Sequence, residues 1–119
     1  MLGYHMSKQS VNNLPKTRPF ATDACAPIVG HVGDGNFHVS PLIDMTNPAE
    51  IHAAEGFTAR LAHRAIAMGG TCTGEHGVGQ KKRAYMEEEH GPAALDLMRR
   101  VKASFDPTNL FNPGKVFYA

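Results

Sequence analysis

Two histidines flank a predicted tight turn in the sequence G-H-V-G-D-G-N-F-H, which covers residues 30–38. An Asp-Gly pair between apolar residues is typical of a type I′ hairpin turn, and Asp34-Gly35 fit its two central positions. In that turn His31 lies directly opposite His38, and both imidazoles project from one face of a β-ribbon. Opposed side chains have Cβ atoms about 5 Å apart and can share one metal ion. The motif therefore predicts a two-histidine metal site that needs a third ligand.

A glycine-rich segment, G-T-C-T-G-E-H-G-V-G at residues 70–79, offers that third ligand. Two neutral imidazoles and the carboxylate of Glu75 leave open coordination positions, as catalytic metal sites require. His76 is next in sequence and points to the other side of an extended loop, where an imidazole can act as a general base. The alternative is that these are ordinary polar residues with satisfied hydrogen bonds. Asn36 could likewise contact a ligand or simply serve the turn.

Three motifs in a fixed order resemble those of the FAD-linked 2-hydroxyacid dehydrogenases. They are G-H-V-G-D-G-N-F-H, G-T-C-T-G-E-H-G-V-G and the terminal D-P-T-N-L-F-N-P-G-K. This is the D-lactate dehydrogenase and glycolate oxidase D-subunit group, within the vanillyl-alcohol oxidase type of flavoprotein. The resemblance covers roughly residues 28–117.

The resemblance implies cofactors and residue roles. The cofactors are FAD and a divalent metal ion, zinc or manganese, and the family's terminal tail packs near the flavin. The implied roles are metal ligation by His31, His38 and Glu75, general-base catalysis by His76 beside the flavin, and flavin contact by Asn112.

The function expected from this resemblance is oxidation of a small 2-hydroxy acid of the D-lactate type, with hydride transfer from C2 to FAD. A quinone or a cytochrome is the expected onward acceptor. Family members carry a far larger flavin-binding domain before this region, so we expect this chain to be a C-terminal fragment that is inactive alone. The alternatives are a glycolate oxidase subunit and a non-catalytic metal-binding or interaction module.

Composition and charge argue against several classes of function, among them nucleic-acid binding and membrane transport. The chain has 119 residues and a formal net charge of +1, so it is one domain at most by length and carries no basic stripe for nucleic acid. No apolar stretch approaches a membrane span and no signal-peptide pattern occurs. We therefore expect a cytoplasmic protein, mitochondrial in a eukaryote, that meets a membrane only through an electron-transfer partner. The two cysteines, Cys25 and Cys72, are expected to be buried reduced thiols.

The pattern of elements predicts an α+β fold with a β-ribbon and about three helices. Residues 1–27 are expected to be disordered or irregular, and residues 28–119 to form part of the FAD-linked oxidase C-terminal domain. The ribbon strands are expected at residues 28–32 and 36–43. A helix should begin after Asn47, with Pro48 in its first position and Glu50 completing a capping box, and it should stop at Gly69-Gly70.

A short helix is predicted over residues 80–90 and a final helix over residues 92–105. The first of these places Lys81, Lys82 and Arg83 at its start and three glutamates at its end, which opposes the helix dipole. Such a basic end could face a substrate carboxylate, with Lys82 as the contact. The alternative is a solvated basic face.

Overall fold

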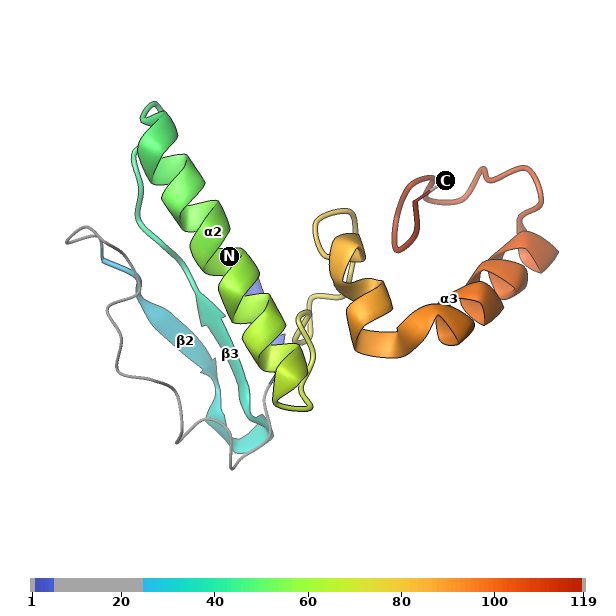
Figure 1. Cartoon of the computed structure of the whole chain (residues 1–119), viewed down its shortest axis with the longest axis horizontal. Coiled ribbons are helices and arrows are strands. Elements are labelled where there is room, and N and C mark those ends of the chain that lie inside the picture. Colours follow the sequence, from blue (N-terminus) through green and yellow to red (C-terminus); the bar gives the residue numbers. More distant parts are fainter. Residues whose placement is uncertain (1, 6–24, 119) are drawn as a thin grey trace. The chain divides into compact units, whose positions relative to one another are not determined.

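The computed structural model describes residues 2–5 and 25–118, which divide into two compact units, Met1–His76 and Gly77–Ala119 (Figure 1). The first unit contains the strands and one α-helix, and the second contains the other α-helix and the C-terminal tail. The predicted α+β class and β-ribbon are present. The described residues contain two α-helices, so the expectation of three was wrong.

The ribbon consists of β2 (Ile28–His31) and β3 (Asn36–Val39), which pair antiparallel. Its register differs from the one predicted, because the connection is a four-residue loop rather than a two-residue turn. The 3-10 turn η1 (Val32–Asp34) is followed by Gly35 in the left-handed conformation, with φ 71°. His31 is therefore paired with Asn36, and His38 with Val29. The predicted direct pairing of His31 with His38 was wrong.

A third strand lies on the other side of β3. Strand β1 (Leu2–His5) pairs antiparallel with β3 and gives the sheet order β1-β3-β2. These four residues belong to the segment expected to be irregular, and most of the rest of that segment lies outside the described residues. A four-residue strand leaves almost no periodic signal in a sequence, so pattern reading had little to detect.

Helix α2 (Pro48–Ala67) begins as the sequence predicts. The Asn47 side chain accepts a hydrogen bond from the amide of Ala49 at 3.1 Å, and its Nδ2 donates to Glu50 Oε1 at 3.0 Å. Figure 1 shows α2 alongside the strands, and it contacts β1. The buried helix residues are small, which allows close packing; they are Ala54, Ala62 and Ala65.

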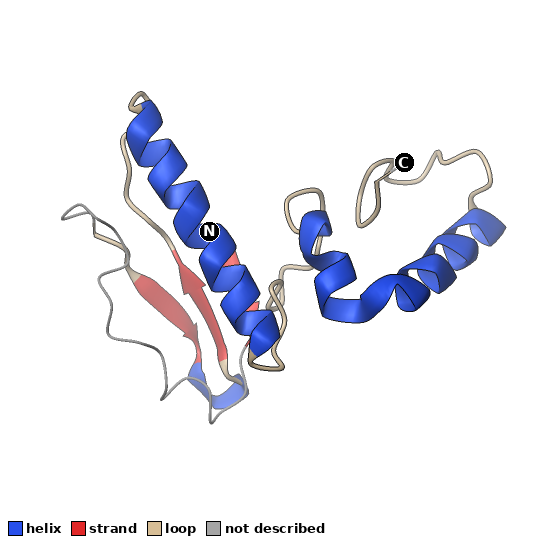
Figure 2. Ribbon diagram, viewed as in Figure 1, coloured by secondary structure: helices blue, strands red, loops and turns tan. Residues whose placement is uncertain are grey.

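Helix α3 (Met86–Phe105) replaces the last two predicted helices (Figure 2). Residues 79–82 form turns and Arg83–Tyr85 form the 3-10 turn η2, so the helix begins six residues later than expected. Gly91 breaks it, with φ 76° and ψ 161°, just before Pro92. This break follows from chemistry, because proline lacks the amide hydrogen and crowds the preceding turn.

The tail after α3 is fixed by side-chain bonds to its backbone. Asp106 accepts from the amides of Leu110 and Phe111, both at 2.8 Å, and pairs with Lys102. Arg83 donates to the carbonyl of Gly114 at 2.7 Å. The tail is therefore an ordered, non-repetitive structure.

Two further expectations can be compared with the structure. Cys72 is buried as expected, whereas Cys25 is exposed, and no disulfide joins them. Within the described residues, neither helix combines the length and apolar character needed to cross a membrane.

Candidate metal and base site

His38 is the most deeply buried of the candidate site residues on the ribbon. It lies in the middle strand of the sheet, and its side chain is 7% exposed. A histidine buried this far must have its ring nitrogens satisfied. Its Nε2 lies 2.7 Å from Glu75 Oε1, while its Nδ1 is buried and has no hydrogen-bond partner among the described residues.

Glu75 lies between two imidazoles. The same Oε1 atom that contacts His38 lies 3.5 Å from His76 Nε2. Glu75 and His76 are both about half exposed, at 45% and 44% of their side-chain surfaces. The three residues place one candidate ligand atom each within 4.8 Å of one another, a spacing that fits a single divalent ion. We call this set the His38–Glu75–His76 cluster.

The surroundings of Glu75 favour its ionised form. Desolvation acts to raise the pKa of its carboxyl group, but a hydrogen bond from its own amide and the adjacent His38 and His76 outweigh this and hold the pKa below its ordinary value. An ionised carboxylate beside two imidazoles is a donor set typical of zinc and manganese sites.

Ring orientation distinguishes the two histidines of the cluster. The rings of His38 and His76 are stacked, with centroids 4.6 Å apart and planes inclined by 15°. An imidazole nitrogen binds a metal with the lone pair that lies in its ring plane, at about 2.0–2.1 Å. Two stacked rings would not both direct their lone pairs at one ion, so a metal at this place would be held by Glu75 and one of the two imidazoles.

His31 lies outside the cluster but on the same face of the ribbon as His38. It is paired with Asn36, and Asn36 and His38 are alternate residues of β3, so all three project from one face. His31 and His38 are thus diagonal neighbours, for which a separation of about 7 to 8 Å is usual. His31 is exposed. Histidine side chains are long enough that two of them at this separation can still reach one metal ion.

Asn36 is buried in β3, with 6% of its surface exposed. Its Oδ1 is buried and has no hydrogen-bond partner among the described residues. Together with Nδ1 of His38, this gives two unpartnered polar atoms from one face of a single strand. The sequence analysis expected the second strand to begin at Asn36, as it does, but it did not foresee that this side chain would be buried.

The remaining two candidates belong to the second unit. Lys82 is 6% exposed, and its Nζ lies 5.8 Å from the centre of the Tyr85 ring. Asn112 is a turn residue of the tail with φ 47°, and its carbonyl accepts from the amide of Lys115 at 3.1 Å. The sequence analysis placed Lys82 at the start of a helix, whereas it precedes the 3-10 turn η2, and it gave no local conformation for Asn112.

Sequence reasoning also missed the stacking of His76 on His38. The prediction gave adjacent residues Glu75 and His76 opposite orientations, as in an extended loop. The chain at residues 73–76 instead turns, with the amide of His76 bonded to the carbonyl of Thr73 at 3.2 Å, so both side chains reach His38. The glycines on either side, Gly74 and Gly77, were the available signal, and both have positive φ.

Comparisons with known proteins show which family this chain belongs to. The profile of the FAD linked oxidases, C-terminal domain, matches residues 13–116. The "Probable D-lactate dehydrogenase, mitochondrial" of Danio rerio is 58% identical over 90 residues, which are 76% of this chain and 18% of that protein. The "D-lactate dehydrogenase (cytochrome), mitochondrial" of Arabidopsis thaliana is 42% identical over 96 residues, 81% of this chain and 17% of that protein. The "Glycolate oxidase subunit GlcD" of Bacillus subtilis is 46% identical over 88 residues, 74% of this chain and 19% of that protein.

This chain spans less than one fifth of the length of these relatives, at 17% to 19%. The match nevertheless covers most of the chain, including the histidine ribbon, the Glu75 loop and the tail. The chain belongs to the FAD linked oxidases and matches the C-terminal domain of that family.

Proposed function

We propose that this chain supplies the metal ligands and the general base with which a larger FAD-dependent enzyme oxidises a small 2-hydroxy acid of the D-lactate type. The observation that carries the proposal is the His38–Glu75–His76 cluster, in which a buried imidazole, an ionised carboxylate and a half-exposed imidazole meet. Family membership and the resemblance to D-lactate dehydrogenases support the reaction class.

We assign the metal to His38, Glu75 and His31. His38 and Glu75 are already in contact, and His31 projects from the same face of the ribbon as His38. The ion is zinc or manganese, since both accept imidazole and carboxylate ligands. When bound, such an ion polarises the hydroxyl oxygen of the substrate and lowers its pKa.

His76 is the proposed general base. Its ring is stacked on that of His38, and we assign His38 rather than His76 to hold the ion. The His76 side chain is 44% exposed, and the contact of its Nε2 with Glu75 Oε1 at 3.5 Å helps to orient the ring, which leaves Nδ1 as the nitrogen that can take a proton. With flavin bound as the hydride acceptor, His76 would take the hydroxyl proton while C2 loses its hydride, which would convert the 2-hydroxy acid to a 2-oxo acid.

Three further contacts belong to this proposal. Asn36 presents a buried amide oxygen that can accept a hydrogen bond from a bound ligand. The Lys82 ammonium is suited to the substrate carboxylate, an assignment that rests on charge complementarity alone. Asn112 is the proposed flavin contact in the tail.

The flavin-binding part of the enzyme is the first partner this proposal requires. The onward electron acceptor is a quinone or a cytochrome, and a cytochrome appears in the printed names of the Arabidopsis and yeast relatives. A mitochondrial location is proposed for the same reason, since the relatives from Danio, Arabidopsis and yeast are named as mitochondrial.

Four alanine variants test the roles, made in an oxidase that contains this region together with its flavin domain. Replacement of His31, His38 or Glu75 should release the metal, because three protein ligands leave little redundancy. His76→Ala should keep metal and flavin but reduce its flavin about 10² to 10⁴ times more slowly. The measurements are metal content by elemental analysis and anaerobic flavin reduction by D-lactate.

His52→Ala is the matched control, since His52 is exposed on α2. If His76→Ala loses the metal and His31→Ala keeps it, the third ligand is His76 and the role assignment is overturned. If all four variants keep the metal, the site itself is wrong. Turnover of glycolate in preference to D-lactate would instead favour the glycolate oxidase type of activity.

A further inference from the structure

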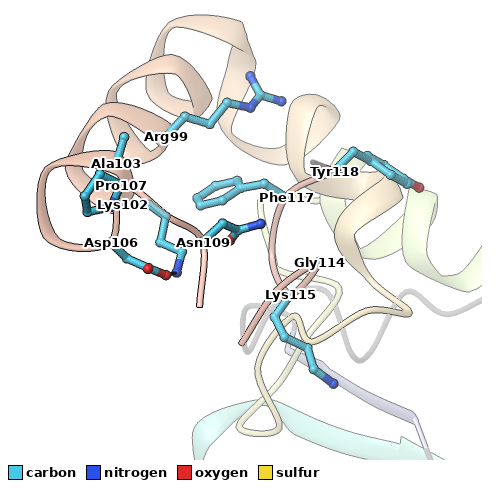
Figure 3. A pocket seen from close by; sticks show the side chains of 10 residues that line it. All are labelled: Arg99, Lys102, Ala103, Asp106, Pro107, Asn109, Gly114, Lys115, Phe117 and Tyr118. Atoms are coloured by element: carbon cyan, nitrogen blue, oxygen red, sulfur yellow. Dashed lines mark hydrogen bonds and ion pairs between the residues drawn. The ribbon is translucent and has the colours of Figure 1, made fainter. Parts of the chain in front are cut away.

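A cavity of about 210 Å³ lies in the second unit, between the C-terminal half of α3 and the tail that follows it (Figure 3). It contains none of the residues of the proposed oxidation site. Its walls come from two parts of the chain, with Arg99, Lys102 and Asp106 from the end of the helix and Asn109, Lys115 and Phe117 from the tail.

The cavity has an excess of positive charge. Among the described residues that line it, Asp106 is the only one with a carboxylate, and this group is buried and already bonded to the amides of Leu110 and Phe111 and to Lys102. Lys102 is occupied as well, because its Nζ also donates to the carbonyl of Phe111 at 2.6 Å.

Arg99 and Lys115 form no ion pair with any residue in the described part of the chain. The Arg99 guanidinium lies 5.9 Å from the centre of the Phe117 ring. Figure 3 shows the Phe117 ring between Arg99 on one side and Asn109 and Asp106 on the other, with Lys115 extending from the rim. An oxyanion is the ligand that such free guanidinium and ammonium groups bind most strongly.

The backbone that builds this wall is strained. Val116 has a φ of 65°, a value that is rare for a β-branched residue, whereas the φ of 52° at Asn109 is one that asparagine adopts more readily. The conformation is held by bonds from outside the tail, including the amide of Val116 to the carbonyl of Gly79 at 2.8 Å and Arg83 to the carbonyl of Gly114. Strain of this kind is concentrated at ligand sites, where surrounding structure maintains it.

We propose that this cavity binds a small planar oxyanion, with the anionic group on Arg99 and the planar part against the Phe117 ring. The ligand class is an aromatic or unsaturated group that carries a carboxylate or a phosphate. Lys115, at the rim, adds positive charge to the entrance of the cavity.

The test is an amide-resolved NMR titration of the whole chain with phenyl phosphate and, separately, benzoate. Saturable shifts confined to residues 99–118 are expected with at least one probe, and the comparison identifies whether phosphate or carboxylate is preferred. Arg99→Gln should weaken binding about tenfold, which corresponds to the loss of one charge-assisted contact. Phe117→Leu should weaken phenyl phosphate but not inorganic phosphate.

Arg100→Gln is the matched control, because it removes the same charge from the next position on α3 outside the cavity lining. Binding should be unchanged in this variant. Absence of saturable shifts with both probes at about 10 mM would overturn the proposal, as would equal weakening by Arg99→Gln and Arg100→Gln. If Arg99→Gln disturbs the fold of the tail, Arg99→Lys provides the second comparison, with intermediate affinity expected and wild-type or absent binding contradicting the assignment.

Discussion

Single residues decide how the ribbon and the site are built. The sequence correctly predicted a hairpin around Asp34-Gly35 and a shared face for His31 and His38. It did not predict the register, since an Asp-Gly pair is compatible with loops of more than one length. The close approach of Gly30 to β3 could not be predicted from the sequence either, because it depends on a backbone contact between the two strands.

We expect Gly30→Ala to disrupt the ribbon. A Cβ atom at this position would lie 2.3 Å from the carbonyl oxygen of Asn36 and 2.6 Å from Cα of Phe37, which is far inside contact distance. The strands must separate to admit it, and overpacking of this kind typically costs about 1 to 3 kcal/mol. Chemical denaturation of the wild type and variant measures the difference.

Gly33→Ala is its control, because a Cβ atom there meets nothing within 4 Å and Gly33 lacks a positive φ. Equal destabilisation by the two substitutions would show that the close approach of β2 to β3 at Gly30 is not the cause.

A second prediction at this scale concerns Asp106. The hydrogen bond from Lys102, with those from the amides of Phe111 and Leu110, outweighs desolvation and holds the pKa of this carboxyl group below 3.8. The pKa is lower in the folded chain than in the unfolded one, so the stabilisation is complete above the unfolded value and is lost as pH falls through the folded value.

Asp106→Asn should therefore be less stable than the wild type at neutral pH, and the difference should shrink as the pH falls below the ordinary value of 3.8 and through the lower pKa of the folded chain. Thermal unfolding at a series of pH values measures it. Asp96→Asn serves for comparison, since Asp96 pairs with Arg100 on an exposed surface. A pH-independent difference for Asp106→Asn would show that its charge is not what secures the tail.

At the scale of elements, local signals predicted the start of α2, the break of α3 at Gly91-Pro92 and its end at Phe105, but not the start of α3. Asn47, Pro48 and Glu50 determine the start of α2 through bonds between residues close in sequence. The start of α3 depends on distant partners, because the tail bonds to Gly79 and Arg83 and holds residues 79–85 in turns. Sequence patterns within a short window do not contain that information.

The observed start of α3 places its charged residues favourably for the helix dipole, whereas the start predicted from the sequence placed them unfavourably. With the helix beginning at Met86, Glu87, Glu88 and Glu89 occupy its first turn, where the helix dipole favours negative charge. The basic run lies before the helix rather than on its first turn. The unfavourable arrangement inferred from the sequence thus resulted from placing the helix start too early.

Glu87→Lys tests this directly through the sign of its effect. Glu87 is exposed, so the substitution changes little besides charge. We expect a loss of about 0.3 to 1 kcal/mol of stability at low ionic strength, reduced by salt. Had Glu87 been near the end of a helix that starts at residue 80, the same substitution would stabilise the chain. Denaturant titrations in low and high salt distinguish the two.

At the scale of the whole molecule, the sequence predicted the family and the identity of the clustered residues better than their geometry. Motif order along the chain was sufficient for membership, which the comparisons confirm. The meeting of Glu75 with His38 was anticipated from chemistry, whereas the stacking of His76 required the fold of the loop. The cavity beside Phe117 had no signal in sequence, since it joins a helix end to an irregular tail.

We predict that the 119-residue chain alone binds no FAD tightly. The isoalloxazine and the pyrophosphate of FAD need a large enclosing surface, which a chain of 119 residues with a small core does not offer. Flavin fluorescence titrated with the chain at micromolar concentration measures binding. Stoichiometric quenching would contradict the prediction. The chain contains no tryptophan, so quenching of the flavin by a tryptophan side chain does not interfere with the measurement.

Strand β2 has a consequence for handling the protein in solution. Within the described residues only β3 pairs with it, and all four of its residues are exposed, including Ile28 at 64% and Val29 at 54%. An open edge of this kind is a template on which another chain can extend the sheet. Concentrated samples will consequently form intermolecular β-structure and lose material to aggregation, and a lysine in place of Val29 will slow that loss.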